Sequence, residues 1–225
     1  MAAVQLRKLC LTINQGDERV HQGRYVYCVI RGSEKKTFGT GFEGNPVYTV
    51  PYKDLSAVVS NVLPVEYEPS AANALIHEEV VERVMQGQTV LPLGFGNVFV
   101  DENRVKWLLV KFYRSFKAYL DKLEGKAEVG VKVNYVEETK VSEEKVYGYG
   151  FRVYEALRRH ADESRLMRRI GGNMILNSSF LIQKNRIQDF KMELEKLEKE
   201  YADKGLKFQF SGPWPPYNFI QIRIS

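Results

Sequence analysis

Residues 77–99 read HEEVVERVMQGQTVLPLGFGNVF, and this stretch decides how the first half of the chain folds. Its first part predicts a helix, because apolar side chains recur on one side among charged ones. Those apolar positions are Val80, Val81, Val84 and Met85. Gly87 predicts the end of the helix, since glycine tolerates the left-handed conformation found there. An apolar run over 89–93 and two further glycines then indicate a packed helix-to-strand junction, not a reacting centre.

The 225 residues suffice for one large domain or two of about 100 residues each. Hydrophobic residues make up 44% and charged residues 27%, which is typical of a globular protein with a core. No apolar run approaches the ~18 residues of a membrane-spanning helix, and the N-terminus is a poor secretory signal. Cys10 and Cys28 are too few for a disulfide framework, so we expect a reduced, cytoplasmic setting and no membrane.

The net charge of +5 comes from 33 basic and 28 acidic residues, which alternate along most of the chain. This balance favours a mixed, solvated surface over a face dedicated to nucleic acid.

Hydrophobic patterns predict an α+β protein of two domains. We expect an N-terminal extension at 1–23, one domain at 24–125 and a second at 126–225. The first domain has predicted strands at 25–30, 47–52 and 55–62, a helix capped by Ser70, and an amphipathic helix that starts near Asp101.

The second domain is predicted to alternate strands and helices. Strands are expected at 128–135, 174–182 and 206–210. A helix spans 143–169, bent or broken near Gly148 and Gly150, and another begins at residue 183. The pattern is close to ferredoxin-like, although one of its usual four strands is not visible.

Two patterns that suggest chemistry lack their context. Gly39, Gly41 and Gly44 spell G-x-G-x-x-G, but a β-rich run follows instead of a phosphate-binding helix, so a hairpin or loop is predicted. His77 begins H-E-x-x-V, and Val81 occupies the place of the second histidine of a zinc helix. No G-x-S-x-G elbow is present. We therefore predict no catalytic, cofactor-binding or metal-binding residue, no cofactor, and no enzyme.

A basic cluster leaves an RNA-binding or regulatory module open as the alternative. Its members are Arg158, Arg159, His160, Arg165, Arg168 and Arg169. The alternation of LKFQF, however, places Phe208 and Phe210 on the face of Leu206, which favours a core position. The cluster can equally bind an acidic patch on a protein.

The tail SGPWPPYNF (211–219) contains P-x-x-P, which is compatible with a polyproline II ligand. We favour a tail that folds Trp214 and Tyr217 back over the core. A partly exposed tryptophan there is also a natural contact for a partner.

Several blocks together resemble the gas vesicle protein F/L family. They are YVYCVI (25–30), DLSAVVSNV (54–62), residues 77–99, MILNSSFLI (174–182) and LKFQFSGPWPPYNF (206–219). The chain departs from the family pattern at Gly94, where arginine is frequent, in a short, basic stretch over 135–174, and in the extension 1–23.

The resemblance implies two ferredoxin-like or modified ferredoxin-like domains and a non-enzymatic accessory role in gas vesicle formation. Its implied partners are the small, hydrophobic major shell protein and other accessory gas vesicle proteins, and its implied location is the cytoplasm, at the gas vesicle. We expect the junction and the tail to form the partner-binding surface. The residues proposed for it are Leu91, Phe95, Phe99, Trp214 and Tyr217.

Overall fold

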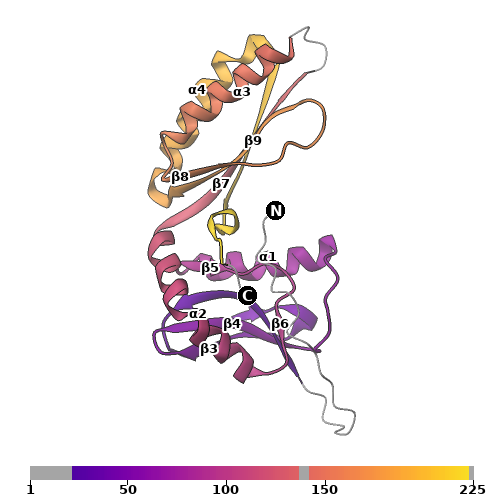
Figure 1. Cartoon of the computed structure of the whole chain (residues 1–225), viewed down its shortest axis with the longest axis vertical. Coiled ribbons are helices and arrows are strands. Elements are labelled where there is room, and N and C mark those ends of the chain that lie inside the picture. Colours follow the sequence, from indigo (N-terminus) through magenta and orange to yellow (C-terminus); the bar gives the residue numbers. More distant parts are fainter. Residues whose placement is uncertain (1–21, 137–141, 223–225) are drawn as a thin grey trace. The chain divides into compact units, whose positions relative to one another are not determined.

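A computed structural model describes residues 22–136 and 142–222. The described chain forms two compact units, each an antiparallel sheet with helices (Figure 1). Unit 1 comprises residues 22–124 and 220–222, and unit 2 is Gly125–Phe219. Residues 220–222, which the sequence analysis grouped with the second domain, therefore lie with the first. There the Tyr119 hydroxyl donates to the carbonyl of Gln221 (3.0 Å) and accepts from its N–H (2.9 Å).

The sheet of unit 1 has the order β2-β3-β4-β1-β5, and β6 also pairs with β1. The strands are β1 (Gly23–Arg31), β2 (Thr37–Thr40), β3 (Pro46–Tyr52), β4 (Leu55–Val62), β5 (Val90–Pro92) and β6 (Val98–Phe99). The three strands predicted from the sequence are confirmed. The G-x-G-x-x-G segment forms β2 and a short turn, as its β-rich sequel predicts. Gly41 lies against the Tyr27 hydroxyl, which occupies the space that a side chain would need.

Both helices of unit 1 begin at the residues that the sequence indicates. In α1 (Ala71–Met85) the Ser70 hydroxyl accepts the N–H of Asn73 at 3.2 Å. In α2 (Glu102–Leu123) the Asp101 carboxylate accepts the N–H of Arg104 at 2.8 Å. Each cap satisfies an N–H that has no partner within the helix.

The two helices use different sets of sheet residues. Val80, Val81 and Val84 of α1 form one core cluster with Val58 and Val62 of β4. Strand alternation points Ala57 and Val59, the neighbours of Val58, to the other face. The helix α2 packs on β1, β3, β4 and β5 through a buried stripe. That stripe is Val105, Leu108, Leu109, Phe116, Leu120 and Leu123.

Unit 2 has the element order β-α-β-β-α-β and the sheet order β10-β7-β9-β8. Its strands are β7 (Lys126–Tyr135), β8 (Glu163–Leu166), β9 (Met174–Gln183) and β10 (Leu206–Trp214), and its helices are α3 (Glu143–Arg158) and α4 (Ile187–Glu200). Figure 1 shows α3 and α4 lying together along the sheet. The arrangement is compatible with the ferredoxin-like fold, and the predicted α+β class is confirmed.

Two details of the predicted helix over 143–169 are wrong. The helix ends at Arg158, and Glu163–Leu166 is strand β8, the strand that the sequence analysis did not find. Its four residues, ESRL, carry too little apolar alternation to indicate a strand. The helix also continues through both glycines. At Gly150 it approaches β9 so closely that a Cβ would lie 2.7 Å from the carbonyl oxygen of Ile175.

Candidate functional site

The stretch 77–99 forms a hydrogen-bonded junction around His77. The Nδ1 atom of His77 accepts the Tyr25 hydroxyl at 3.0 Å, and Nε2 donates to the carbonyl of Leu93 at 3.0 Å. The same Tyr25 hydroxyl accepts the N–H of Gly96 at 2.9 Å. This set of partners assigns a neutral imidazole with its proton on Nε2. Helix α1, the strand β1 and the glycine loop are thereby joined through one buried ring.

Aromatic rings surround this junction. The cluster consists of Tyr25, Tyr27, Phe42, Tyr67, His77 and Phe95, with ring centroids between 4.4 and 6.2 Å apart. Burial lowers the pKa of His77 to about 4, since a charged imidazole would lose its hydration there. The ring is therefore neutral at physiological pH. Both of its nitrogens are used within the protein, which gives this histidine a structural role.

Two residues of the predicted partner surface, Leu91 and Phe99, are buried. Leu91 is fully buried, and Phe99 is 7% exposed. Phe95 is partly buried among the rings around His77. Side chains in a packed core offer almost no area to a partner. Leu91 and Phe99 therefore support the junction from inside, and Phe95 is the predicted residue of this stretch that reaches the surface.

The tail in unit 2 is fixed by a buried carboxylate. Glu128 accepts the backbone N–H of Asn218 at 3.0 Å and also its side-chain amide, and that amide donates to the Ser179 hydroxyl at 3.2 Å. Burial raises the pKa of Glu128, and the hydrogen bonds from Asn218 oppose the rise. Phe219 is buried directly after this contact. The tail thus folds back on unit 2 at Asn218 and Phe219, whereas Trp214, which we expected over the core, stays exposed.

Trp214 and Tyr217 occupy different depths in this tail. Trp214 is 37% exposed, whereas Tyr217 is half-buried. Pro215 and Pro216 between them are buried, so the P-x-x-P segment is not offered as a free polyproline ligand. Trp214 is the most accessible of the five predicted contact residues. It lies in unit 2, whereas Leu91, Phe95 and Phe99 lie in unit 1.

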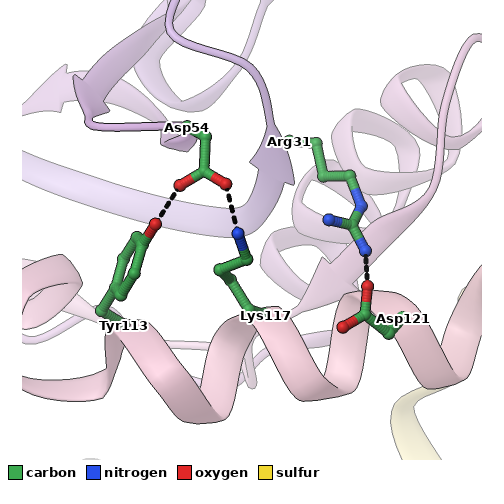
Figure 2. Close-up of polar contacts among 5 residues, drawn as sticks. All are labelled: Arg31, Asp54, Tyr113, Lys117 and Asp121. Carbon is green, nitrogen blue, oxygen red and sulfur yellow. Dashed lines mark hydrogen bonds and ion pairs between the residues drawn. The ribbon is translucent and has the colours of Figure 1, made fainter.

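A second candidate surface, which the sequence analysis missed, lies where α2 meets the ends of the strands in unit 1. Asp54 accepts hydrogen bonds from the Tyr113 hydroxyl and from Lys117 Nζ, the latter at 2.6 Å, and Arg31 pairs with Asp121 (Figure 2). The bonds from Lys117 and Tyr113 lower the pKa of Asp54 to about 2. These contacts hold the turn before β4 against the exposed side of α2.

A shallow hollow adjoins these contacts. It is lined by Tyr52, Lys53, Val110, Lys111, Tyr113, Arg114 and Ser115. Lys53 Nζ lies 4.9 Å from the Tyr113 ring centre, and Lys111 Nζ lies 4.9 Å from that of Trp107. The signal in the sequence is a second stripe on α2, with residues 107, 110, 111 and 114 at helical spacing. From the sequence alone, this stripe is indistinguishable from an ordinary solvated helix face. The structure adds that Trp107 within it is exposed.

Strand β10 places two of its aromatic residues, Phe208 and Phe210, toward the helices. Phe208 and Phe210 pack against the core cluster that contains the buried residues of α3 and α4. Lys207 and Gln209, which alternate with them, are exposed. An RNA-binding sheet stacks bases on aromatic side chains of its open face. The two aromatics that suggested an RNA-binding module are thus on the wrong face of β10 for that role.

Cys28 lies in β1 with its side chain fully buried, and burial raises the pKa of its thiol. Within residues 22–136 and 142–222, no group of three or more His, Cys, Asp or Glu side chains is arranged to hold a metal ion. In the same described ranges, no helix has the length and apolar character needed to cross a membrane.

The protein is thus an α+β protein of two units. The stretch around His77 has a structural role, and exposed aromatic side chains lie elsewhere, at Trp214 and on α2. The chain belongs to the gas vesicle synthesis protein GvpL/GvpF family, whose model matches residues 23–147 and 142–221. The resemblance stated from the sequence is thereby confirmed.

Individual relatives agree with this assignment. Gas vesicle protein F of Haloferax mediterranei is 33% identical over 205 residues, which are 89% of this chain and 94% of the relative. Gas vesicle protein F1 of Halobacterium salinarum is 30% identical, over 89% of this chain and 93% of the relative.

Two crystal structures share the fold. GvpF from Anabaena sp. PCC7120 aligns with a TM-score of 0.80 at 23% identity, over 90% of this chain and 98% of that one. GvpF from Microcystis aeruginosa aligns with a TM-score of 0.75 at 20% identity, over 89% and 99%.

Proposed function

We propose that this protein assists the nucleation and assembly of gas vesicles without catalysing a reaction. It does so by binding the major shell protein and other accessory gas vesicle proteins in the cytoplasm, at the forming vesicle. Membership of the GvpL/GvpF family supports the gas vesicle context. A shell subunit that exposes apolar surface before assembly aggregates unless a partner covers that surface. The protein provides such cover through exposed aromatic side chains.

The observation that carries this proposal is the way in which Trp214 is presented. Trp214 is 37% exposed, and the two prolines that follow it are buried. Asn218 is bonded to Glu128 four residues later, which fixes the segment on its C-terminal side. Tryptophan is enriched among the residues that dominate binding energy at interfaces. A side chain on a segment that is already ordered loses less conformational freedom when it binds.

The test is a binding titration of the full-length protein with the isolated major shell protein. We expect Trp214→Ala to weaken binding about tenfold or more, which is a typical loss for an interface tryptophan. Leu75→Ala is the control, because Leu75 is 55% exposed on α1 in unit 1 and belongs to neither candidate surface. Circular dichroism and thermal melting establish that both variants are folded.

Phe95→Ala tests whether Phe95 stabilises the fold of unit 1 or contacts the shell protein. Phe95 packs beside the ring of Tyr25, so its removal is expected to lower the melting temperature of unit 1. Its effect on binding the shell protein should be smaller than that of Trp214→Ala. If a folded Trp214→Ala protein binds the shell protein as tightly as the wild type, the proposed role of Trp214 is wrong.

A further inference from the structure

Unit 2 exposes large apolar side chains beside β8, the strand at one edge of its sheet. Tyr147 and Phe151 of α3 are 52% and 65% exposed. Leu166 of β8 is 64% exposed, and Ile170, in the connection to β9, is 69% exposed. Single exposed apolar residues are ordinary on protein surfaces, but several together mark a contact surface. Their significance therefore depends on whether they are neighbours.

Two contacts on either side of these residues make them neighbours. The Tyr154 hydroxyl of α3 lies 2.8 Å from the Ser164 hydroxyl of β8, and the guanidinium of Arg169 lies 4.5 Å from the ring centre of Tyr147. Helix α3 thus follows the β8–β9 hairpin for two turns, because Tyr147 and Tyr154 are seven residues apart. Phe151 lies between these tyrosines on the same side of the helix.

Leu166 lies two residues after Ser164, on the same face of β8. We call the resulting set, Tyr147, Phe151, Leu166 and Ile170, the α3–β8 patch.

Strand β8 is an open edge of its sheet. In the order β10-β7-β9-β8, it pairs with β9 on one side only. The N–H of Met167 donates to the carbonyl of Asn177 in β9 at 2.7 Å. Backbone groups in an antiparallel pair alternate between the partner and the other side, so those of the neighbouring Leu166 point to the edge. Such groups are a template for an added strand.

Two arginines follow this edge. Arg168 and Arg169 are exposed directly after β8. Within the part of the chain that the structure describes, neither of them forms an ion pair with an acidic side chain. Guanidinium groups bind carboxylates with two parallel hydrogen bonds. They also repel each other, which disfavours the pairing of two β8 edges from two copies of this chain.

We propose that the α3–β8 patch binds an extended segment of a partner protein in which apolar and acidic residues alternate, and that this segment adds a strand to β8. The period of two in a strand sends its apolar side chains to Phe151 and Leu166. Acidic side chains at the end of the segment that runs past Leu166 meet Arg168 and Arg169, which follow β8 directly. This binding mode uses neither Trp214 nor the shell protein, so it stands apart from the proposed function.

The probe is a synthetic peptide in which valine alternates with glutamate, titrated into the full-length protein and followed by fluorescence anisotropy. We expect saturable binding that weakens as salt is raised, because the acidic arm is electrostatic. A peptide with lysine in place of glutamate should bind at least about tenfold more weakly. A valine–glutamate peptide methylated on its alternate backbone nitrogens should also lose binding, since it cannot complete the strand ladder.

Substitutions locate the site. Phe151→Ser with Leu166→Ser should weaken peptide binding about tenfold or more, as expected when an apolar anchor is lost. Leu75→Ser is the matched control, since Leu75 is 55% exposed but lies on α1 in unit 1, outside both candidate surfaces. Arg168→Ala with Arg169→Ala should weaken binding and reduce its dependence on salt.

Four results would overturn the proposal. They are no saturable binding by the folded wild-type protein, equal binding of the lysine peptide, equal binding of the methylated peptide, and unchanged binding by the Phe151 and Leu166 variant. Analytical sedimentation tests whether a second copy of this chain, and not a partner protein, pairs with the β8 edge. A dimer that is lost on Leu166→Pro would assign the edge to a second copy of this chain and contradict the proposed partner.

Discussion

Each unit contains a buried titratable side chain that joins distant parts of the chain, and the two do so in opposite ways. In unit 1, His77 is neutral and sealed under aromatic rings, where it links α1 to Tyr25 and to the carbonyl of Leu93. In unit 2, Glu128 holds the tail through Asn218, and the tail leaves Trp214 exposed nearby. His77 and Asn218, the partner of Glu128, belong to stretches by which the family is recognised. One stretch is internal, and the other presents a surface.

The difference shows why a family signature is not by itself a binding site. The stretch 77–99 is distinctive because a histidine, two glycines and several rings must fit together in a closed space. The tail 211–219 is distinctive because prolines and Asn218 fix a segment that carries an accessible indole. Burial separates the two cases, and burial depends on contacts across the fold.

The largest expected effect comes from removing the internal junction. His77→Ala eliminates two hydrogen bonds, leaves the Leu93 carbonyl without this donor, and opens a cavity under the rings. We expect unit 1 to lose about 3 kcal/mol or more of unfolding free energy. Urea denaturation followed by Trp107 fluorescence, in a Trp214→Phe background, reports unit 1 alone. His160→Ala is the control and should cost less than about 0.5 kcal/mol, as is usual away from such features.

The next effect is a dependence of unit 1 stability on pH. The pKa of His77 is about 4 in the folded protein, below its ordinary value of 6.5. Between these values the unfolded chain binds more protons, so stability is full above pH 6.5 and is lost as pH falls toward 4. A difference of 2.5 pKa units corresponds to a loss on the order of 3 kcal/mol.

Denaturation of unit 1 at pH 7, 5.5 and 4 measures this loss. His77→Gln should flatten the curve over this interval, because glutamine does not titrate. If the wild type and His77→Gln show the same slope between pH 6.5 and 4, another group is responsible and the neutral, sealed ring is the wrong description.

A third test concerns how a helix is attached to its sheet. In unit 1 His77 joins α1 to the sheet by hydrogen bonds, whereas in unit 2 the backbone of α3 at Gly150 packs closely against β9. Gly150→Ala would place a Cβ 2.7 Å from the Ile175 carbonyl oxygen, so α3 must shift. We expect a loss of about 1–3 kcal/mol, the usual cost of overpacking. Gly148→Ala on the same helix meets nothing within 4 Å and should stabilise unit 2 by about 0.5–1 kcal/mol. Trp214 fluorescence in a Trp107→Phe background follows both.

These two glycines also show where reasoning from sequence stops. Both were expected to bend or break the helix, because glycine weakens helices in general. The structure instead has a continuous α3, and Gly150 serves the contact with β9. A close approach between residues 25 positions apart leaves no local pattern. The caps at Ser70 and Asp101, by contrast, depend on residues three positions away and were found from the sequence.

Residues whose environment depends on local contacts were placed correctly from the sequence, and those that depend on distant contacts were not. Alternation in LKFQF placed Phe208 and Phe210 in the core, because that pattern depends only on the strand itself. Strand β8 was missed since ESRL gains its strand conformation from pairing with β9. Leu91 was predicted as a contact because an apolar run reads the same whether it faces a partner or a core.

A smaller effect is expected when the carboxylate that holds the tail is neutralised. Glu128→Gln keeps one acceptor oxygen for Asn218 and lacks the negative charge that strengthens the bonds. Because burial already raises the pKa of Glu128, neutralisation also removes a desolvation cost. We therefore expect a net loss of only about 1 kcal/mol in unit 2. A loss as large as that of His77→Ala would show that the tail is as integral to unit 2 as the junction is to unit 1.

The smallest effect should come from the exposed contacts in Figure 2, which complete the comparison with a titratable group that is not buried. Hydrogen bonds from Lys117 and Tyr113 lower the pKa of Asp54 to about 2, yet its carboxylate is open to solvent. Water and salt screen such a pair, so a shifted pKa there does not translate into stability. Asp54→Asn should leave the melting temperature of unit 1 unchanged at pH 7, whereas His77→Ala lowers it clearly. If the two variants lowered the melting temperature equally, the number of hydrogen-bond partners, and not burial, would decide how much a polar side chain stabilises unit 1.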